Sequence, residues 1–218
     1  MSPLILTLAC MAVSFWICGI PFGLIIARAH GIDVRKEGSG NIGMTNVART
    51  VGGGAAAATL LLDLFKGTVC VLLSRFLLAR FFLGGDWSLT VPQEALGWSP
   101  AWVYAACVFG HIFSPYLGFH GGKGISVGLG AGLGLSWPIG LGPLAVFLAA
   151  AIPSGYVSLG SILAAASVPV WAFALGFNHL AIVPLALVAA VVIWSHRENI
   201  GRLLSGTERK FSLHKKQG

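Results

Sequence analysis

The chain has 218 residues, of which 56% are hydrophobic and only 10% are charged. A soluble domain carries roughly 25% charged residues, so the composition excludes a soluble enzyme and indicates an integral membrane protein. The formal charge of +7 favours contact with anionic lipids or substrates near a bilayer, and we expect no nucleic-acid partner.

The apolar runs of the chain predict a bundle of membrane-spanning helices. Residues 4–27 are too long for the hydrophobic core of a signal peptide and lack a basic segment before them, so we expect a retained span. Residues 52–83, 101–119, 159–176 and 179–194 are four further candidate spans. Residues 125–152 are apolar but interrupted by Pro138 and Pro143. They form either one kinked helix or a hairpin of two short helices, each of about fourteen residues.

The basic residues are unevenly distributed and predict the orientation. Ten of the fourteen lysines and arginines fall in residues 28–50 and 196–218, which places both segments on the cytoplasmic side. If Lys123 also lies there, an even number of crossings separates it from His196, which favours the hairpin. We therefore expect an all-α membrane protein with seven transmembrane helices, an external (periplasmic) N-terminus and a cytoplasmic C-terminus.

A polar loop of small residues follows the first span. It offers three glycines, two hydroxyls, two amides and a closing arginine. Glycine lets backbone N–H groups approach an oxyanion, and the planar guanidinium matches phosphate oxygens. The alternative is a flexible connector. The candidate ligands in this loop are Gly38, Ser39, Gly40, Asn41, Gly43, Thr45, Asn46 and Arg49.

A second glycine-rich segment occupies residues 119–124, where Gly121, Gly122 and Gly124 flank Lys123. A lysine beside the start of a helix suits a phosphate, because it adds a point charge to the free N–H groups of the first turn. No Ser or Thr follows the lysine directly, so the segment is not a P-loop. The alternative is a turn whose lysine reaches toward the membrane surface.

A third polar cluster covers residues 196–208. If this segment is helical, His196 and Asn199 share one face while Arg197 and Glu198 point elsewhere. The two residues on the shared face are then able to meet a ligand. The alternative is an ordinary interfacial helix end with its basic residues toward lipid headgroups. Ser158, in a polar break before another span, is expected on the same side of the membrane.

Charged residues inside the second apolar run are a further candidate site. Asp63 and Lys66 have i, i+3 spacing, and ionisable groups inside a bilayer are costly and commonly functional. The pair belongs either to a site or to a brace between helices. Arg75 and Arg80 are expected to reach out to the membrane surface.

The remaining histidines and the cysteines carry no expected chemistry. His111 and His179 are isolated in apolar helices and are expected to make structural hydrogen bonds. The cysteines have no paired spacing and are interpreted as small hydrophobic residues, so no disulfide framework or zinc site is expected. They are Cys10, Cys18, Cys70 and Cys107.

Jointly, these motifs resemble the bacterial acyl-phosphate:glycerol-3-phosphate acyltransferases of the PlsY type. Ser-Gly-Asn-Ile-Gly-Met-Thr-Asn-Val-Ala-Arg at 39–49 is similar to the family's first motif. Gly-His at 110–111 with Phe-His-Gly-Gly-Lys-Gly at 119–124 resembles the second, and His-Arg-Glu-Asn-Ile at 196–200 the third. Asp-Leu-Phe-Lys-Gly at 63–67 is also similar to a family signature. Met44 replaces the usual alanine, and His120 the usual lysine, which removes a positive charge beside the expected site.

The match covers essentially the whole chain, which we therefore expect to be a single transmembrane acyltransferase domain, residues 1–218. Its cytoplasmic motif regions would be residues 38–50, 119–124, 154–158 and 196–208. The resemblance implies transfer of a fatty acyl group from acyl phosphate to the sn-1 hydroxyl of glycerol 3-phosphate. The products would be lysophosphatidic acid and phosphate, in the first step of phospholipid synthesis at the bacterial inner membrane.

The resemblance also implies which residues act. The expected catalytic residues are Ser39, Arg49, Lys123, His196 and Asn199. The pocket would be shaped by Asn41, Thr45, Asn46, Gly121, Gly122 and Gly124. Substrates and membrane lipids are the expected partners, with the enzyme that forms acyl phosphate as a functional partner. No cofactor or metal is expected.

The mechanism follows from a missing motif. A histidine followed five residues later by aspartate, the base pair of acyl-CoA or acyl-carrier-protein acyltransferases, does not occur in the sequence. An acyl phosphate is already activated, so alignment and charge stabilisation suffice. Our hypothesis is that a substrate phosphate takes the hydroxyl proton, and the rival hypothesis makes His196 the base.

Two non-enzymatic functions compete with this interpretation. A transporter or flippase for an organic phosphate or phospholipid would also need phosphate ligands in a membrane bundle. Such proteins commonly carry inverted repeats with sites at the midplane, whereas this sequence shows no repeat and gathers its polar clusters at one face. An inactive scaffolding member is disfavoured because Ser39, Arg49, Lys123 and Asn199 are all present.

Overall fold

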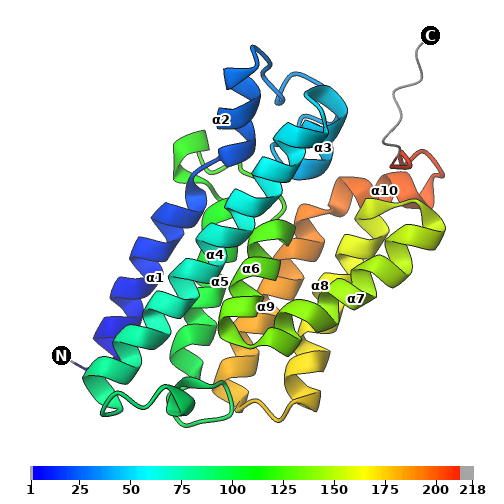
Figure 1. Cartoon of the computed structure of the whole chain (residues 1–218). Coiled ribbons are helices and arrows are strands. Elements are labelled where there is room, and N and C mark those ends of the chain that lie inside the picture. The colour runs from blue at the N-terminus through cyan, green and yellow to red at the C-terminus, as the bar shows by residue number, and fades with distance from the viewer. Residues whose placement is uncertain (1, 212–218) are drawn as a thin grey trace.

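The computed structural model describes residues 2–211, and every regular element in this part of the chain is a helix (Figure 1). This confirms the all-α prediction. The elements in chain order are α1 (Pro3–Gly19), α2 (Phe22–Ala29), α3 (Met44–Thr50), α4 (Gly53–Phe82), the 3₁₀ turn η1 (Trp87–Thr90), α5 (Trp98–Ile112), the 3₁₀ turn η2 (Pro115–Leu117), α6 (Ile125–Leu135), α7 (Trp137–Ser154), α8 (Val157–Ala174), α9 (His179–Ser195) and α10 (Arg197–Leu204).

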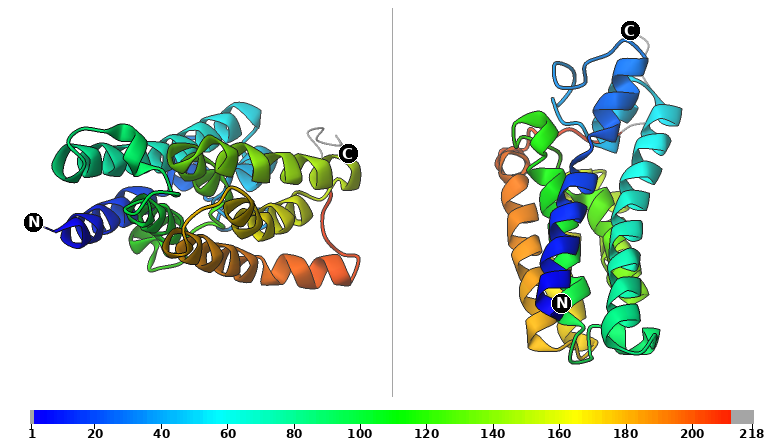
Figure 2. Two further views of the ribbon diagram at one scale, coloured as in Figure 1. Left: turned by 90° about the horizontal axis from the view of Figure 1, so that it is seen from below. Right: turned by 90° about the vertical axis from the view of Figure 1, so that its left-hand side faces the viewer.

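The long helices lie side by side in one bundle, as the views from below and from the side also show (Figure 2). The chain starts at the lower end in Figure 1 and runs up through α1 to α2 and α3. The loop before α3, α3 itself and the segments that follow α5, α7 and α9 all lie toward this upper end. The four polar motif regions therefore gather at one end of the bundle, which is the arrangement a shared site requires.

Not every helix has the length of a membrane span. Residues 3–29, 53–82, 137–154 and 157–174 are long and apolar enough to cross, and α9 with α10 adds a fifth candidate if their 56° bend lies within one span. Helix α5 has 15 residues and α6 has 11. The third predicted span thus ends at Ile112 instead of residue 119, and η2 with the glycine-rich segment follows it.

The first apolar run forms the predicted first span as two helices, α1 and α2, with a short break between them. The break falls at Ile20 and Pro21. Proline lacks an N–H group and forces the preceding residue out of helical geometry, and Ile20 accordingly has a ψ of 120°. The apolar run continues across the break, so hydrophobicity alone did not reveal it.

The region between Lys123 and residue 155 is a pair of packed helices, α6 and α7. Two helices here were predicted because an even number of membrane crossings must separate Lys123 from His196. They separate at Ser136, which is fully extended, and Pro138 lies in the first turn of α7, where its missing N–H is not needed. The helices have 11 and 18 residues instead of about fourteen each. Both ends of the pair lie toward the upper end of the bundle (Figure 1).

Small residues let α4 and α6 approach closely. A Cβ atom on Gly130 would lie 1.9 Å from the Leu64 carbonyl oxygen, and one on Gly67 would lie 2.6 Å from that of Val127. The Thr68 hydroxyl donates a hydrogen bond of 2.8 Å to the Gly130 carbonyl across this contact. Close backbone approach through small residues is typical of helix pairs in membranes.

Arg75 differs from the expectation that it reaches the membrane surface. It is buried within the bundle and its guanidinium donates hydrogen bonds to the carbonyls of Gly134 and Leu135 at the end of α6. It also donates to the Thr90 hydroxyl. These last-turn carbonyls have no partner within their own helix, so Arg75 caps α6 inside the bundle.

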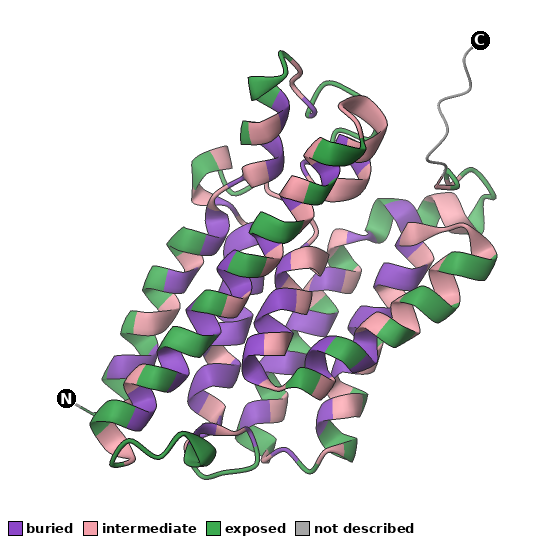
Figure 3. Cartoon of the chain, viewed as in Figure 1, coloured by how far each residue is buried: buried purple, intermediate pink, exposed green. Residues whose placement is uncertain are grey.

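Exposed positions run along the outward sides of the helices over most of the bundle height (Figure 3), and many of them are large hydrophobic residues. Exposed residues include Leu61, Phe65, Phe76 and Phe173, far more apolar area than a soluble monomer leaves uncovered. A hydrocarbon environment accounts for this surface. The main buried core is contributed by α1, α4, α5, α6, α7, α8 and α9.

Candidate active site

A cavity of about 620 Å³ connects the motif end of the bundle with its interior. Its upper wall is polar and includes the side chains of Ser39, Arg49, Lys123, Ser158, His196 and Asn199. Its lower wall is apolar and is formed by α6, α7, α8 and α9, with Leu144, Phe147, Val168 and Val188 among the lining residues. The cavity is therefore amphipathic, with hydrogen-bonding groups at the end where the motifs meet.

The first motif forms a loop that Asn46 holds together. This side chain is buried, and its Nδ2 atom donates to the carbonyls of Val34, Glu37 and Asn41 at 3.0, 3.1 and 2.9 Å. Its Oδ1 atom accepts the N–H of Ser39 at 2.9 Å. All of these hydrogen bonds of Asn46 are made to backbone groups of the loop, so the role of Asn46 in the site is to position Ser39.

The groups that the loop presents to the cavity are Ser39 and Arg49. Neither the Ser39 hydroxyl nor the Arg49 guanidinium has a hydrogen-bond partner among residues 2–211, and both line the cavity. Asn41 closes the turn before α3 by accepting the N–H of Gly43 at 2.8 Å, and Thr45 lines the cavity on α3. A hydroxyl and a guanidinium without internal partners suit an anionic ligand.

The second motif packs against the end of α5 in a way the sequence did not suggest. The N–H groups of Gly121 and Gly122 donate to the carbonyls of Ile112 and His111 at 2.9 and 3.1 Å. A Cβ atom on either glycine would lie within 2.2 Å of His111. These N–H groups are thus used inside the protein, and neither glycine lines the cavity. Close packing on α5 explains the glycines, and only Lys123 and Gly124 of the segment face the cavity.

Lys123 lies at one end of a polar network that links three elements. Its Nζ atom donates a hydrogen bond to the Asn199 side-chain oxygen on α10. The Asn199 amide donates to the Glu208 carboxylate at 2.7 Å. Burial lowers the pKa of Lys123 to about 8, and the nearby Arg202 contributes in the same direction. The lysine is therefore a cation that titrates close to neutral pH.

Glu208 closes this network from the segment after α10. Its carboxylate accepts hydrogen bonds of 2.7 Å from Ser158, Asn199 and Arg202. Burial by itself would raise the pKa of Glu208, but these donors hold the pKa below its ordinary value. The carboxylate is ionised and accepts from all three donors, so it places a negative charge beside Arg202 and near Lys123.

His196 and Asn199 are buried at the start of α10 and line the cavity, while Arg197 and Glu198 are exposed. The Nδ1 atom of His196 lies 2.7 Å from the Val192 carbonyl, to which it donates. Burial lowers the pKa of His196 to about 4. The imidazole is neutral at pH 7 and leaves its Nε2 atom as an acceptor.

Asp63 and Lys66 form the predicted pair, deep inside the bundle. The Lys66 Nζ atom lies 2.7 Å from the Asp63 carboxylate and 2.7 Å from the Ile20 carbonyl, to which it donates. It also lies 3.3 Å from the Nδ1 atom of His111, which is therefore not isolated. Asp63 and His111 line the cavity, and Lys66 does not. The pair joins α4 to the break after α1 and to the end of α5.

Comparison with known proteins identifies the family to which this site belongs. The family model described as Glycerol-3-phosphate acyltransferase matches residues 8–206. The chain belongs to the glycerol-3-phosphate acyltransferase family. A relative of that name from Geobacter sulfurreducens is 42% identical over 214 residues, covering 97% of this chain and 98% of its own. One from Rubrobacter xylanophilus is 43% identical over 193 residues, covering 88% of each chain.

Two solved structures of the glycerol-3-phosphate acyltransferase family have the same fold. Both are crystal structures of PlsY (YgiH), an integral membrane glycerol 3-phosphate acyltransferase. The glycerol 3-phosphate form is 32% identical with a TM-score of 0.82, covering 94% of this chain and 96% of its own. The lysophosphatidic acid form is 31% identical with a TM-score of 0.80, covering 95% and 96%. The membrane bundle described above is thus the fold of this acyltransferase family.

Three expectations from the sequence, for His120, His179 and Gly40, differ from the structure. His120, which replaces the family's usual lysine, is exposed, lies against the Gly118 carbonyl and does not line the cavity. The position of the missing lysine therefore does not line the cavity, whereas the loss of a charge beside the site was expected. His179 is exposed and has no side-chain hydrogen bond among the described residues, because it lies in the first turn of α9. Gly40 also lies outside the cavity lining, whereas Gly38 and Gly43 contribute to it.

Proposed function

We propose that this acyltransferase moves a fatty acyl group from acyl phosphate to the sn-1 hydroxyl of glycerol 3-phosphate. The hydroxyl oxygen attacks the acyl carbonyl carbon, and the bond from that carbon to the phosphate oxygen breaks. The hydroxyl proton passes to a phosphate oxygen, and lysophosphatidic acid and phosphate leave. The observation that supports this proposal is the amphipathic cavity, which offers cations at one end and an apolar channel between helices at the other.

In this proposal, different residues of the polar wall bind the phosphates of the two substrates. Ser39 and Arg49, whose donors have no partner among residues 2–211, would hold one phosphate, and Lys123 with Asn199 would hold the other. The acyl chain occupies the apolar part between α7, α8 and α9 and enters from the bilayer. Asn46 and the glycines at 121 and 122 hold the loops that carry these groups, and Asp63 with Lys66 anchors the second of them.

The test is an assay of the purified protein in detergent with glycerol 3-phosphate and three donors in parallel. The donors are long-chain acyl phosphate, acyl-CoA and acyl-carrier-protein. Lysophosphatidic acid from acyl phosphate alone supports both the reaction and the donor class. Product from acyl-CoA at an equal rate contradicts the donor assignment. No product from any donor, with the protein folded, would leave transport of an organic phosphate as the leading function.

The decrease of kcat/KM at alkaline pH should follow the deprotonation of Lys123. Its pKa of about 8 in the free protein means that the cation is present below pH 8 and is lost as the pH rises through it. Because kcat/KM reports the free enzyme, we expect kcat/KM to fall above pH 8. Arginine stays charged at these values, so Lys123→Arg should be less active but lack this fall. The same alkaline fall in both proteins would contradict the assignment.

His196→Gln should separate the two hypotheses for the proton. The low pKa of His196, about 4, makes it a weak base, and in our proposal it only supplies a hydrogen bond. We expect kcat of the variant to fall far less than the roughly 10²–10⁴-fold that loss of a general base costs. Rates are compared at saturating substrates. If chemistry is lost while binding of glycerol 3-phosphate survives, substrate assistance is wrong and His196 is the base.

We further propose that the helices cross the inner membrane seven times, with the cavity entrance on the cytoplasmic face. The supporting observation is that the motif end of the bundle carries Arg28, Arg35, Arg197 and Arg202, whereas the connector at residues 83–97 has no lysine or arginine. A reporter that fluoresces only in the cytoplasm should be bright when fused to the C-terminus and dark when fused to the N-terminus. The reverse pattern would overturn the orientation.

A further inference from the structure

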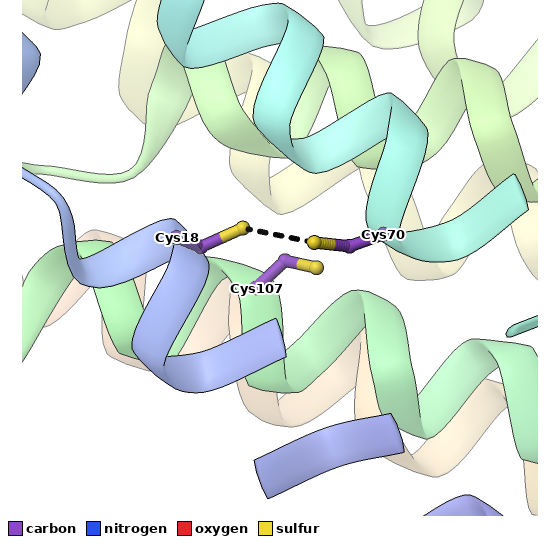
Figure 4. A group of neighbouring side chains, drawn as sticks. All are labelled: Cys18, Cys70 and Cys107. Atoms are coloured by element: carbon purple, nitrogen blue, oxygen red, sulfur yellow. Dashed lines mark hydrogen bonds between the residues drawn. The ribbon is translucent and has the colours of Figure 1, made fainter. Parts of the chain in front are cut away.

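Three of the four cysteines meet in the interior, although nothing in their spacing along the chain groups them. Cys18 on α1, Cys70 on α4 and Cys107 on α5 point toward one another from three helices (Figure 4). Their sulfur atoms all lie within 4.8 Å of one another, and those of Cys18 and Cys70 are 4.0 Å apart. All three side chains are buried. The interpretation as unrelated hydrophobic residues is therefore incomplete.

This spacing fits a metal ion held by three sulfurs. Metal–thiolate bonds are about 2.3 Å long, so three sulfurs around a central ion in one plane are about 4.0 Å apart. A disulfide would instead need the two sulfurs at about 2.05 Å. The cluster is separate from the substrate cavity, because none of the three cysteines lines it.

The ligand set selects the kind of ion. Structural zinc sites are four-coordinate, and no fourth Cys, His, Asp or Glu side chain among residues 2–211 joins the group. Copper(I) is a soft ion that thiolates select, and it accepts three sulfur ligands. Each thiol that becomes a thiolate ligand releases one proton to the solvent, and the ion does not change its oxidation state.

We propose that Cys18, Cys70 and Cys107 form a copper(I) site that links α1, α4 and α5. Access is provided by a crevice of about 180 Å³ between α1 and α4, lined by Cys10, Ser14 and Cys70. The ion would join three helices near the break after α1, where Lys66 of α4 also bonds to Ile20. Its effect is on stability and not on the acyl transfer itself.

The test uses the full chain purified in detergent, with its thiols reduced, the reductant removed and oxygen excluded. Copper(I) is titrated in competition with a coloured chelator, and bound copper per chain is measured. We expect one copper(I) per chain and an upward shift of the melting temperature. Cys18→Ala, Cys70→Ala and Cys107→Ala should each lose both effects.

Cys10→Ala is the matched control. This half-buried cysteine lies on α1 beside the crevice but outside the cluster, so the variant should bind copper as the unaltered protein does. Acylation of glycerol 3-phosphate by each variant shows that a loss of copper is not a loss of fold. The proposal is overturned if the unaltered protein retains no copper(I), if it prefers zinc, or if Cys107→Ala binds copper equally well.

Discussion

Replacing Lys123 by methionine should lower kcat/KM for glycerol 3-phosphate by about 10²–10³-fold, the effect of removing one charge-stabilising donor from a preorganised site. The lysine lines the cavity and donates to Asn199. Methionine has similar length but carries neither charge nor donor, so the phosphate loses a counter-charge while the segment keeps its packing on α5. The rates are measured with acyl phosphate as donor, under conditions in which both proteins remain folded.

The matched control for this variant is Lys36→Met. Lys36 lies in the exposed loop before the first motif and does not line the cavity, so its removal changes the net charge equally without touching the site. We expect the control to keep nearly full activity. A loss below tenfold in Lys123→Met, or an equal loss in both variants, would show that the cation is not used at a specific position.

Asp63→Leu should lower the free energy of unfolding by about 3–5 kcal/mol, the usual effect of removing one partner from a buried ion pair. Lys66 would keep its contact with the Ile20 carbonyl but lose the carboxylate 2.7 Å away. The variant should also lose activity, since the pair supports His111, whose carbonyl holds the segment before Lys123. Denaturant unfolding in detergent measures the first effect.

The double variant Asp63→Leu with Lys66→Met shows whether the stability effect comes from the unpaired charge. Apolar residues of similar size often replace a buried pair without loss, so the double variant should be more stable than Asp63→Leu. Asp33→Asn, which removes the partly exposed partner of the exposed Arg35, should change the unfolding free energy little. If the single variant is as stable as the double, the buried pair does not contribute as argued.

The sequence predicted the parts of this fold that depend on composition and spacing along one helix. Uncharged runs of about 20 residues become helices because the backbone must satisfy its own hydrogen bonds in lipid. The i, i+3 spacing of Asp63 and Lys66 was sufficient to predict their contact. The even number of crossings between Lys123 and His196 was sufficient to favour two helices over one between residues 125 and 152.

Features that depend on the meeting of distant segments were not predictable in the same way. Glu208 was part of the third motif region but received no role, because nothing in its neighbourhood shows that Ser158 of α8 will donate to it. His111 was interpreted as isolated since its partners lie on α4, 45 residues earlier. The glycines before Lys123 were assigned to phosphate, although the structure uses their N–H groups on α5. Pro21 is a local signal for the break between α1 and α2, and it was not used in predicting the first span.

The capping of α6 by Arg75 constrains how the chain is assembled in the membrane. The guanidinium leaves the ribosome 59 residues before the Gly134 carbonyl to which it bonds. An ionised side chain is costly in hydrocarbon, while α6, at 11 residues, is too short to cross the bilayer by itself. Helix α6 therefore offers carbonyl partners to the charged Arg75 of α4, and α4 offers a long packing partner to the short α6. Biogenesis should hold α4 at the insertion machinery until α5 has passed and α6 has arrived, so that the two enter the lipid as a pair.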